Sequence, residues 1–218
     1  VLSDTMYVQG SHIYQRWDTL TSVWYGQEKE TYTYDERGNR TIWLDQNWIA
    51  NEWVNSWKGT YTYNTSGKQV EELSQDWDGI VWVNYHKSTS TYNEQGNQTE
   101  WLDKKWDGSS WVNNEKGTNT YDANGYQSEF LWQIFDGSAW VNSFRNNFVY
   151  DINGNETEYV QQYWYESAWV NNGKYTHTYD ANGNQTEELY QTWNGSAWSS
   201  FWRCTYTYNL NNKRTEGL

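Results

Sequence analysis

The sequence repeats itself with a period of 29 residues, and this period limits the possible folds more than any other feature. A tyrosine stands four residues before the glycine that marks most copies, and a tryptophan follows fifteen residues after it. These glycines are Gly38, Gly67, Gly96, Gly125, Gly154 and Gly183. Asn212 takes the next glycine position, and the first copy is shifted around Trp17 and Trp24. We expect a single repeat domain over residues 1–218 with about seven repeats, excised from a longer array because residues 213–218 begin another copy.

Each repeat has the pattern of two β-strands. Runs rich in Thr, Val, Tyr and Trp are bounded by Asp, Asn and Gly, as in short strands joined by tight turns. The DERG, EQG and DANG segments predict three-residue hairpin loops with a left-handed glycine, and WDGSSW and WNGSAW predict four-residue loops between paired tryptophans. An odd period needs one odd and one even loop to keep the register constant. The pattern predicts an all-β chain that forms a continuous antiparallel meander, as a twisted single layer or spiral sheet, with a closed barrel as the alternative.

In the register that these loop lengths give, one face of the sheet carries a stripe of tryptophan pairs. The predicted structural pairs are Trp48 with Trp53, Trp77 with Trp82, Trp106 with Trp111, Trp164 with Trp169, and Trp193 with Trp198. The same face carries Tyr92 opposite Gln98 and a column of glutamates. The other face carries a column of cations opposite aromatic or acidic partners, which we interpret as cross-strand contacts. In order, Lys58, Lys87, Lys116, Arg145, Lys174 and Arg203 face Trp43, Glu72, Trp101, Phe130, Tyr159 and Glu188.

Composition excludes several classes of function. The 15 Lys and Arg against 28 Asp and Glu give a net charge of −13, and no basic patch compensates for it, so we expect no nucleic-acid partner. No apolar run approaches the length of about 18 residues that a membrane helix needs, so we expect no membrane insertion. Cys204 is the single cysteine, and His12, His86 and His177 are far apart in sequence. We therefore expect neither a metal site nor a cofactor.

The repeat pattern argues against two kinds of carboxylate chemistry. The DINGN and DANGN segments at Asp151 and Asp180 resemble the start of a calcium loop, but the later ligands are missing and hairpin turns prefer the same residues. The glutamate column has a spacing near that of an inverting glycosidase. The column recurs identically in each repeat, whereas an active site is singular, so we expect no enzymatic function. Its members are Glu71, Glu100, Glu129, Glu158, Glu187 and Glu216.

The segments YDERGNRT at Tyr34, YDINGNET at Tyr150 and YDANGNQT at Tyr179 resemble the signature of the YD or RHS repeat family. The resemblance covers nearly the whole chain. It implies a β-sheet shell in a secreted or cell-surface bacterial protein, in a family whose members encapsulate toxins or engage glycans and other surfaces. The WDGSAWVN-type segment is not part of that signature and is similar to Trp-rich tandem repeats of large secreted bacterial surface proteins.

Two function classes remain open for the aromatic residues. The first is adhesive carbohydrate binding, with a polysaccharide or cell-surface glycan as partner, because exposed rings stack on sugars and linked sites gain avidity. The second is a structural stalk, shell or filament that self-associates through its sheet edges. Tryptophans in columns where other repeats have different residues are the better ligand candidates, because the scaffold does not require them. These are Trp43, Trp57, Trp101, Trp132 and Trp202.

Overall fold

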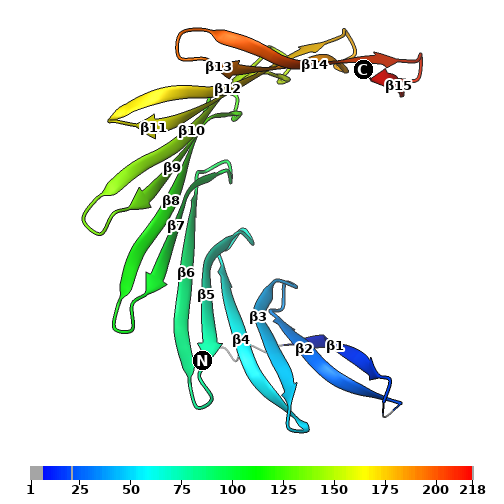
Figure 1. The fold of residues 1–218 in the computed structure, drawn as a ribbon, viewed down its shortest axis with the longest axis vertical. Helices are drawn as coiled ribbons and strands as arrows, with labels where there is room; N and C mark the ends of the chain where they lie inside the picture. The colour runs from blue at the N-terminus through cyan, green and yellow to red at the C-terminus, as the bar shows by residue number, and fades with distance from the viewer. Residues whose placement is uncertain (1–6, 21, 218) are drawn as a thin grey trace. The chain divides into compact units, whose positions relative to one another are not determined.

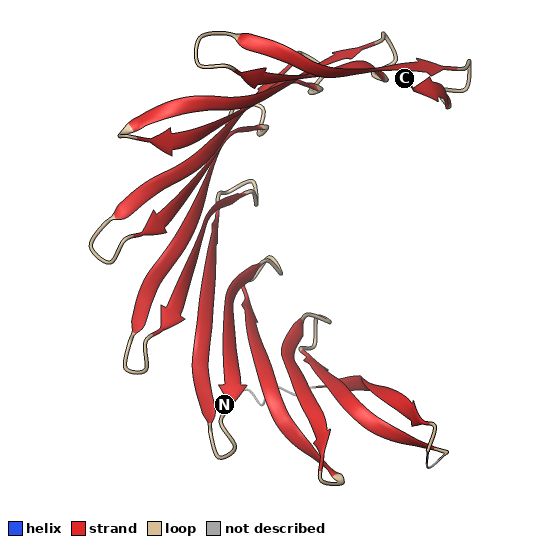
Figure 2. Ribbon diagram, in the orientation of Figure 1, coloured by secondary structure: helices blue, strands red, loops and turns tan. Residues whose placement is uncertain are grey.

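The structure is a computed structural model that describes residues 7–20 and 22–217. The described chain is all β, with strands joined by short loops (Figure 2). The strands are β1 (Tyr7–Asp18), β2 (Val23–Tyr34), β3 (Arg40–Ile49), β4 (Glu52–Tyr63), β5 (Gln69–Trp77), β6 (Trp82–Tyr92), β7 (Gln98–Trp106), β8 (Trp111–Tyr121), β9 (Gln127–Phe135), β10 (Trp140–Tyr150), β11 (Glu156–Tyr165), β12 (Ala168–Tyr179), β13 (Gln185–Trp193), β14 (Trp198–Tyr208) and β15 (Arg214–Gly217). This confirms the predicted fold class.

The strands follow one another in the hydrogen-bonded order of the sequence, from β1 to β15 (Figure 1). This order confirms the predicted meander, and it ends at β1 and β15 instead of returning from one to the other, so the barrel alternative is not adopted. By its backbone contacts the chain divides into two compact units. One contains residues 1–91 and 101–114, and the other contains residues 92–100 and 115–218. Both are built from the same repeat.

The two predicted loop types close opposite ends of the strands. In the loop after β10, Gly154 donates its backbone N–H to the Asp151 carbonyl at 3.1 Å and has a φ of 84°, as the predicted left-handed glycine requires. The Asp151 carboxylate accepts the backbone N–H groups of Asn153 and Asn155 at 2.8 and 2.9 Å. The acidic residue therefore satisfies turn donors, as a hairpin turn predicts.

The loops between paired tryptophans use the same device. Asp107 donates its backbone N–H to the Ser110 carbonyl at 3.1 Å, and its carboxylate accepts the backbone N–H groups of Ser109 and Ser110, each at 2.8 Å. These hydrogen bonds favour the ionised form and lower the pKa of Asp107 to about 2. The acidic loops are therefore turn-forming elements at neutral pH.

The predicted register is wrong along much of each strand, because every fully paired repeat contains two β-bulges. Between β5 and β6, Gln75 pairs with Asn84 but Ser74 pairs with His86, which leaves Tyr85 as an extra residue. A second bulge lies near the glycine loop, where Tyr63 pairs with Gln69 and Thr62 with Glu71. An extra residue transfers the following side chains of its strand to the opposite face.

These bulges overturn the predicted partners of the cation column. Lys58 pairs with Leu44 instead of Trp43, and Lys87 pairs with Leu73 instead of Glu72. The same shift gives the other cations with described pairings aliphatic partners, namely Leu131 for Arg145, Val160 for Lys174 and Leu189 for Arg203. The column therefore lies on the face of the tryptophan pairs. The tyrosine and glutamine beside each glycine loop do pair, as Tyr63 does with Gln69. They lie on the face opposite the tryptophan pairs, whereas the sequence predicted them on the same face.

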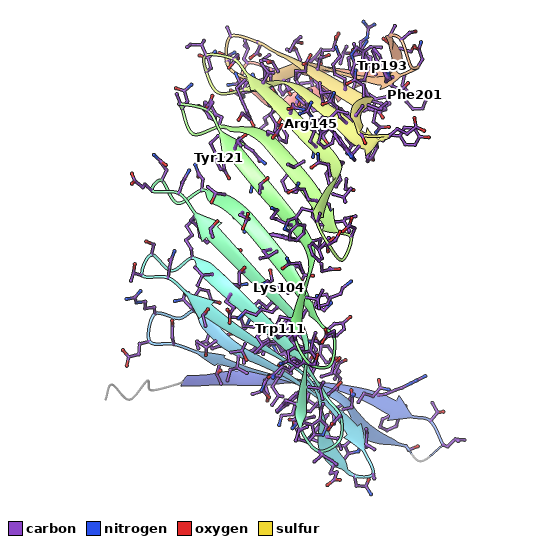
Figure 3. All side chains as sticks on the ribbon, turned by 90° about the vertical axis from the view of Figure 1, so that its left-hand side faces the viewer. Lys104, Trp111, Tyr121, Arg145, Trp193 and Phe201 are labelled. Carbon is purple, nitrogen blue, oxygen red and sulfur yellow. The ribbon has the colours of Figure 1, made fainter. Side chains whose placement is uncertain are left out.

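Following the pairings across β4, β5 and β6 separates two faces. The regular face carries residues such as Leu73, Gln75 and Trp77, whose types recur from repeat to repeat. The variable face carries residues such as Glu72 and Ser74, whose types differ among the repeats. Side chains project from both sides of the ribbon (Figure 3). Tyr61, at 5% exposed, is the one buried large hydrophobic side chain among the described residues, as expected of a single-layer sheet.

Candidate functional site

The regular face brings the predicted tryptophan pairs together. Each pair crosses a hairpin end in an edge-to-face arrangement, with ring centroids 5.0 to 5.2 Å apart. Trp111 of one pair and Trp193 of another are labelled in Figure 3. Phe135 and Trp140 form the equivalent pair, with ring centroids 5.3 Å apart, in the fourth glycine-marked repeat, where phenylalanine replaces the first tryptophan.

Four cations of the column on this face reach across an intervening strand to a tryptophan of the next pair. Lys58 Nζ lies 4.7 Å from the Trp82 ring centroid, and the Arg145 guanidinium lies 4.6 Å from that of Trp169. Lys116 and Lys174 cover Trp140 and Trp198 in the same way, at 4.8 and 5.3 Å. A cation–π contact of this kind contributes about 0.5–1 kcal/mol at exposed sites. The cations therefore join neighbouring repeats.

Four members of the glutamate column form ion pairs with cations on this face. Lys87 Nζ lies 2.7 Å from Glu71 Oε2, and Arg145 lies 3.5 Å from Glu129. Lys174 and Arg203 lie 3.7 and 3.8 Å from Glu158 and Glu187. These carboxylates serve the scaffold in repeat after repeat.

The variable face of the first unit holds an aromatic cluster around Arg40. Trp43 contacts Trp57 edge-to-face at 5.4 Å and Tyr32 at 5.7 Å between ring centroids. The Arg40 guanidinium lies 4.8 Å from the ring centroids of both Trp43 and Tyr61. We call Tyr32, Arg40, Trp43, Trp57 and Tyr61 the first cluster. It combines ring faces with one cation.

Carboxylates border the first cluster, and one of them raises the pKa of a tyrosine in it. The Trp43 indole N–H donates to Asp45 Oδ1 at 2.6 Å, and the Tyr32 hydroxyl donates to Glu30 Oε2 at 2.7 Å. The hydrogen bond to Glu30 raises the pKa of Tyr32 to about 12, and burial raises that of Tyr61 to about 12. Burial also raises the pKa of Asp45, against the opposing hydrogen bond from Trp43.

The second unit holds two further clusters on its variable face. In the second cluster, Trp132 stacks on Phe144 with ring centroids 5.8 Å apart and 13° between the ring planes. The ring centroids of Phe130 and Tyr163 lie 5.8 and 6.4 Å from that of Phe144. In the third cluster, Tyr190 lies 4.6 Å from Tyr175 and 5.9 Å from Trp202, measured between centroids. Tyr159 joins the third cluster through Tyr175 at 5.6 Å.

Glycines let these rings lie against the sheet. A Cβ on Gly117 would lie 2.8 Å from the Phe130 ring, and a Cβ on Gly59 would lie 2.6 Å from Trp57. A Cβ on Gly173 would similarly lie 2.9 Å from Tyr190. The small residues and the rings above them are therefore matched, as in aromatic rescue of strand glycines.

A polar recess of about 430 Å³ lies on the variable face of the first unit. His86 Nδ1 lies 3.0 Å from Asp103 Oδ1, and Asn114 donates its side-chain N–H to Asp103 Oδ2 at 2.7 Å. The Tyr85 and His86 rings lie 4.3 Å apart. We call this the central recess, and its walls are Trp57, Glu72, Ser74, Tyr85, His86, Ser88 and Asp103.

A second recess, of about 490 Å³, lies between two glycine loops and is a product of the repeat itself. The Tyr63 hydroxyl donates to the Arg40 carbonyl at 2.8 Å within it. Tyr121, Tyr179 and Tyr208 make the same bond to the carbonyl 23 residues earlier. The recurrent tyrosine therefore ties each glycine loop to its neighbour.

A half-buried histidine lies beside the third cluster, on β12 with Tyr175. His177 lies 3.9 Å from both Glu156 and Glu188, one carboxylate on each ring nitrogen. Burial raises the pKa of Glu156, and the His177 charge opposes that effect.

In the described chain no group of three or more His, Cys, Asp or Glu side chains has the geometry to hold a metal ion. No described helix is long and apolar enough to span a membrane.

The candidate ligand tryptophans lie on the variable face where their pairings are described. Trp43 and Trp57 belong to the first cluster, Trp132 to the second and Trp202 to the third. Trp101 lies half-buried on β7 in the repeat position of Trp43. Their ligand-binding role stays a prediction. Sequence reasoning missed the central recess, although the change of residue type at Ser74, His86 and Asp103 was a signal for it.

No family model matches the chain, and no curated protein matches it. Among solved structures, a DUF3836 family protein from Bacteroides vulgatus is 22% identical, with 40% of this chain and 91% of that chain covered and a TM-score of 0.35. A porin-like protein from Bacteroides uniformis is 13% identical, with 81% and 87% covered and a TM-score of 0.35. TcdB2-TccC3 without its hypervariable C-terminal region is 12% identical, with 95% and 12% covered and a TM-score of 0.39. The resemblance to YD or RHS repeats therefore remains one of sequence motif.

Proposed function

We propose that this chain is a non-catalytic carbohydrate-binding repeat protein that uses its variable face. The observation that carries the proposal is the separation of the two faces. The tryptophan pairs, cations and glutamates of the regular face contact one another in repeat after repeat. The aromatic residues that differ between repeats gather on the other face, beside carboxylates, hydroxyls and amides.

The chemistry of the variable face suits a sugar chain. Ring faces of Trp and Tyr stack on the apolar faces of pyranoses, while side-chain oxygens and amides form hydrogen bonds with hydroxyl groups. The first, second and third clusters offer several such places along one chain. Binding of one polysaccharide at linked sites would raise its affinity without new contacts.

The proposed location is the bacterial exterior, as a secreted or cell-surface adhesin. The YD-like motif supports this location, and an acidic surface is compatible with neutral or cationic glycans. Nucleic acids are unsuitable partners because a net charge of −13 repels their phosphates.

A structural element, such as a stalk, shell or filament, is the second candidate. One observation favours it: rings of the variable face already satisfy one another, as in the stack of Trp132 on Phe144. The strand order ends at β1 and β15, which supply edges for self-association.

A pull-down on insoluble polysaccharides and a soluble glycan panel, followed by intrinsic tryptophan fluorescence, test the proposal. We expect saturable binding to one glycan class that weakens about tenfold, or 1.4 kcal/mol, in Trp132→Ala. Tyr165→Ala is the matched control, because Tyr165 is 62% exposed and outside the three clusters. Absence of binding across the panel, together with light scattering from polymers, would favour the structural element.

A further inference from the structure

We propose that the central recess is a subsite for an amino sugar with a protonated amine. This inference rests on the proposed carbohydrate-binding function and names the class of sugar. Its starting point is a concave site of about 430 Å³, within the range of about 300–1,000 Å³ typical of small-molecule pockets. Four neighbouring strands, β4 to β7, contribute its walls.

The recess has an aromatic wall and an acidic wall. Trp57 and Tyr85 supply rings, and Glu72 and Asp103 supply carboxylates. Gln69 Nε2 contacts Glu72 Oε2 at 3.4 Å, a long bond that leaves the carboxylate able to accept further donors. A ring face beside a carboxylate is the environment that attracts an ammonium group.

Lys58 of β4 and Lys87 of β6 do not neutralise these carboxylates, and Arg40 of the first cluster lies against the Tyr61 ring. Lys58 and Lys87 lie on the regular face, where Lys58 covers Trp82 and Lys87 pairs with Glu71. The described walls of the recess contain no lysine or arginine, and His86 is their one basic side chain. A positively charged ligand would supply a counter-charge for Glu72, because Asp103 already lies beside His86.

Ser74 adds a hydroxyl group to the walls of the recess. It lines the recess and is 8% exposed. Asp103, at 7% exposed, is held in place by His86 and Asn114. The recess therefore combines a fixed carboxylate with a hydroxyl group.

The test compares β-1,4-linked oligomers of equal length made of glucosamine, N-acetylglucosamine or glucose, by isothermal titration calorimetry on the full chain. We expect the glucosamine oligomer to bind at least about tenfold more tightly than the other two. Glu72→Gln should abolish this preference, because it removes one carboxylate of the recess while preserving the shape of the side chain. Glu94→Gln, in an exposed loop, changes the net charge equally and should retain the preference.

Each outcome separates the two proposals. Equal affinity for the three oligomers overturns the amino-sugar subsite and leaves the proposed function standing, whereas no binding of any carbohydrate in the wider panel overturns both. A preference that survives in both Glu72→Gln and Asp103→Asn places the amine elsewhere and also overturns the inference. Loss of preference in Glu94→Gln as well would show attraction by net charge alone. Circular dichroism and thermal unfolding of each variant establish that it is folded.

Discussion

The two faces of the sheet differ in how their side chains vary between repeats. On the regular face, a cation, a tryptophan pair and a glutamate recur with a period of 29 residues, and the cations contact tryptophans and glutamates of neighbouring strands. On the variable face, the position of Ser74 holds Asp45, Asp103, Trp132, Gln161 or Tyr190 in other repeats. The difference indicates that one face can stabilise every repeat equally while the other is free to diversify.

The energetics of the regular face are small for each contact and large in sum. An edge-to-face ring pair contributes about 0.5–1.5 kcal/mol beyond its buried area. Nearest-neighbour terms of this size add along a repeat array. The variable face has no such uniform term, because its clusters are separated by polar positions such as Ser74 and Asp103.

The largest expected effect comes from the regular face. Trp82→Ala removes both the ring contact with Trp77 and the cation–π contact with Lys58. It should lower the free energy of unfolding by about 2–4 kcal/mol. Urea unfolding followed by circular dichroism measures it. Trp57→Ala, on the variable face, should cost less than half as much. Equal losses would break the distinction between the faces.

A smaller effect tests the match between glycines and rings on the variable face. Gly117→Ala places a Cβ 2.8 Å from Phe130 and should cost about 1–3 kcal/mol through overpacking. Ser88 occupies the same repeat position and already carries a Cβ, so Ser88→Ala is the control and should leave the urea midpoint nearly unchanged. A Gly117→Ala midpoint as high as that of the wild type would show that the ring moves freely.

The recurrent tyrosine of the glycine loop should give a still smaller loss. Tyr63→Phe removes the hydrogen bond to the Arg40 carbonyl and should cost about 0.5–1.5 kcal/mol. Tyr165→Phe alters an exposed phenol and should change nothing measurable in the same thermal unfolding experiment. A cost for both variants would point to a general effect of the phenol instead of this bond.

The mildest test is alkaline titration of the first cluster. The pKa of Tyr32 and that of Tyr61 are each raised to about 12, so the fold favours their neutral forms. Their contribution to stability is complete below the ordinary value of 10.0 and falls as the pH rises towards about 12. Tyrosinate absorbance should show a late component that disappears in the Tyr32→Phe, Tyr61→Phe double variant. Persistence of that component would assign it to other tyrosines.

Local chemistry explains why much of the fold was predictable. Gly154 at a positive φ and the Asp151 carboxylate on the turn N–H groups are properties of a few adjacent residues. The pair of Trp106 and Trp111 follows from the loop between them. The partners of Lys58 and Lys87 were not predictable, because they depend on bulges further along the strand.

The sequence by itself determined the repeat, the strands, the loops and the tryptophan pairs, because each of these features depends on residues that are close together in the chain. Only the tertiary structure decided which columns share a face. Each of the two bulges in a repeat shifts the register of its strand pair by one residue. The two shifts are equal, so they cancel over one period, and the period of 29 residues does not reveal them. The central recess depends on the same shift, since it needs Ser74 opposite His86.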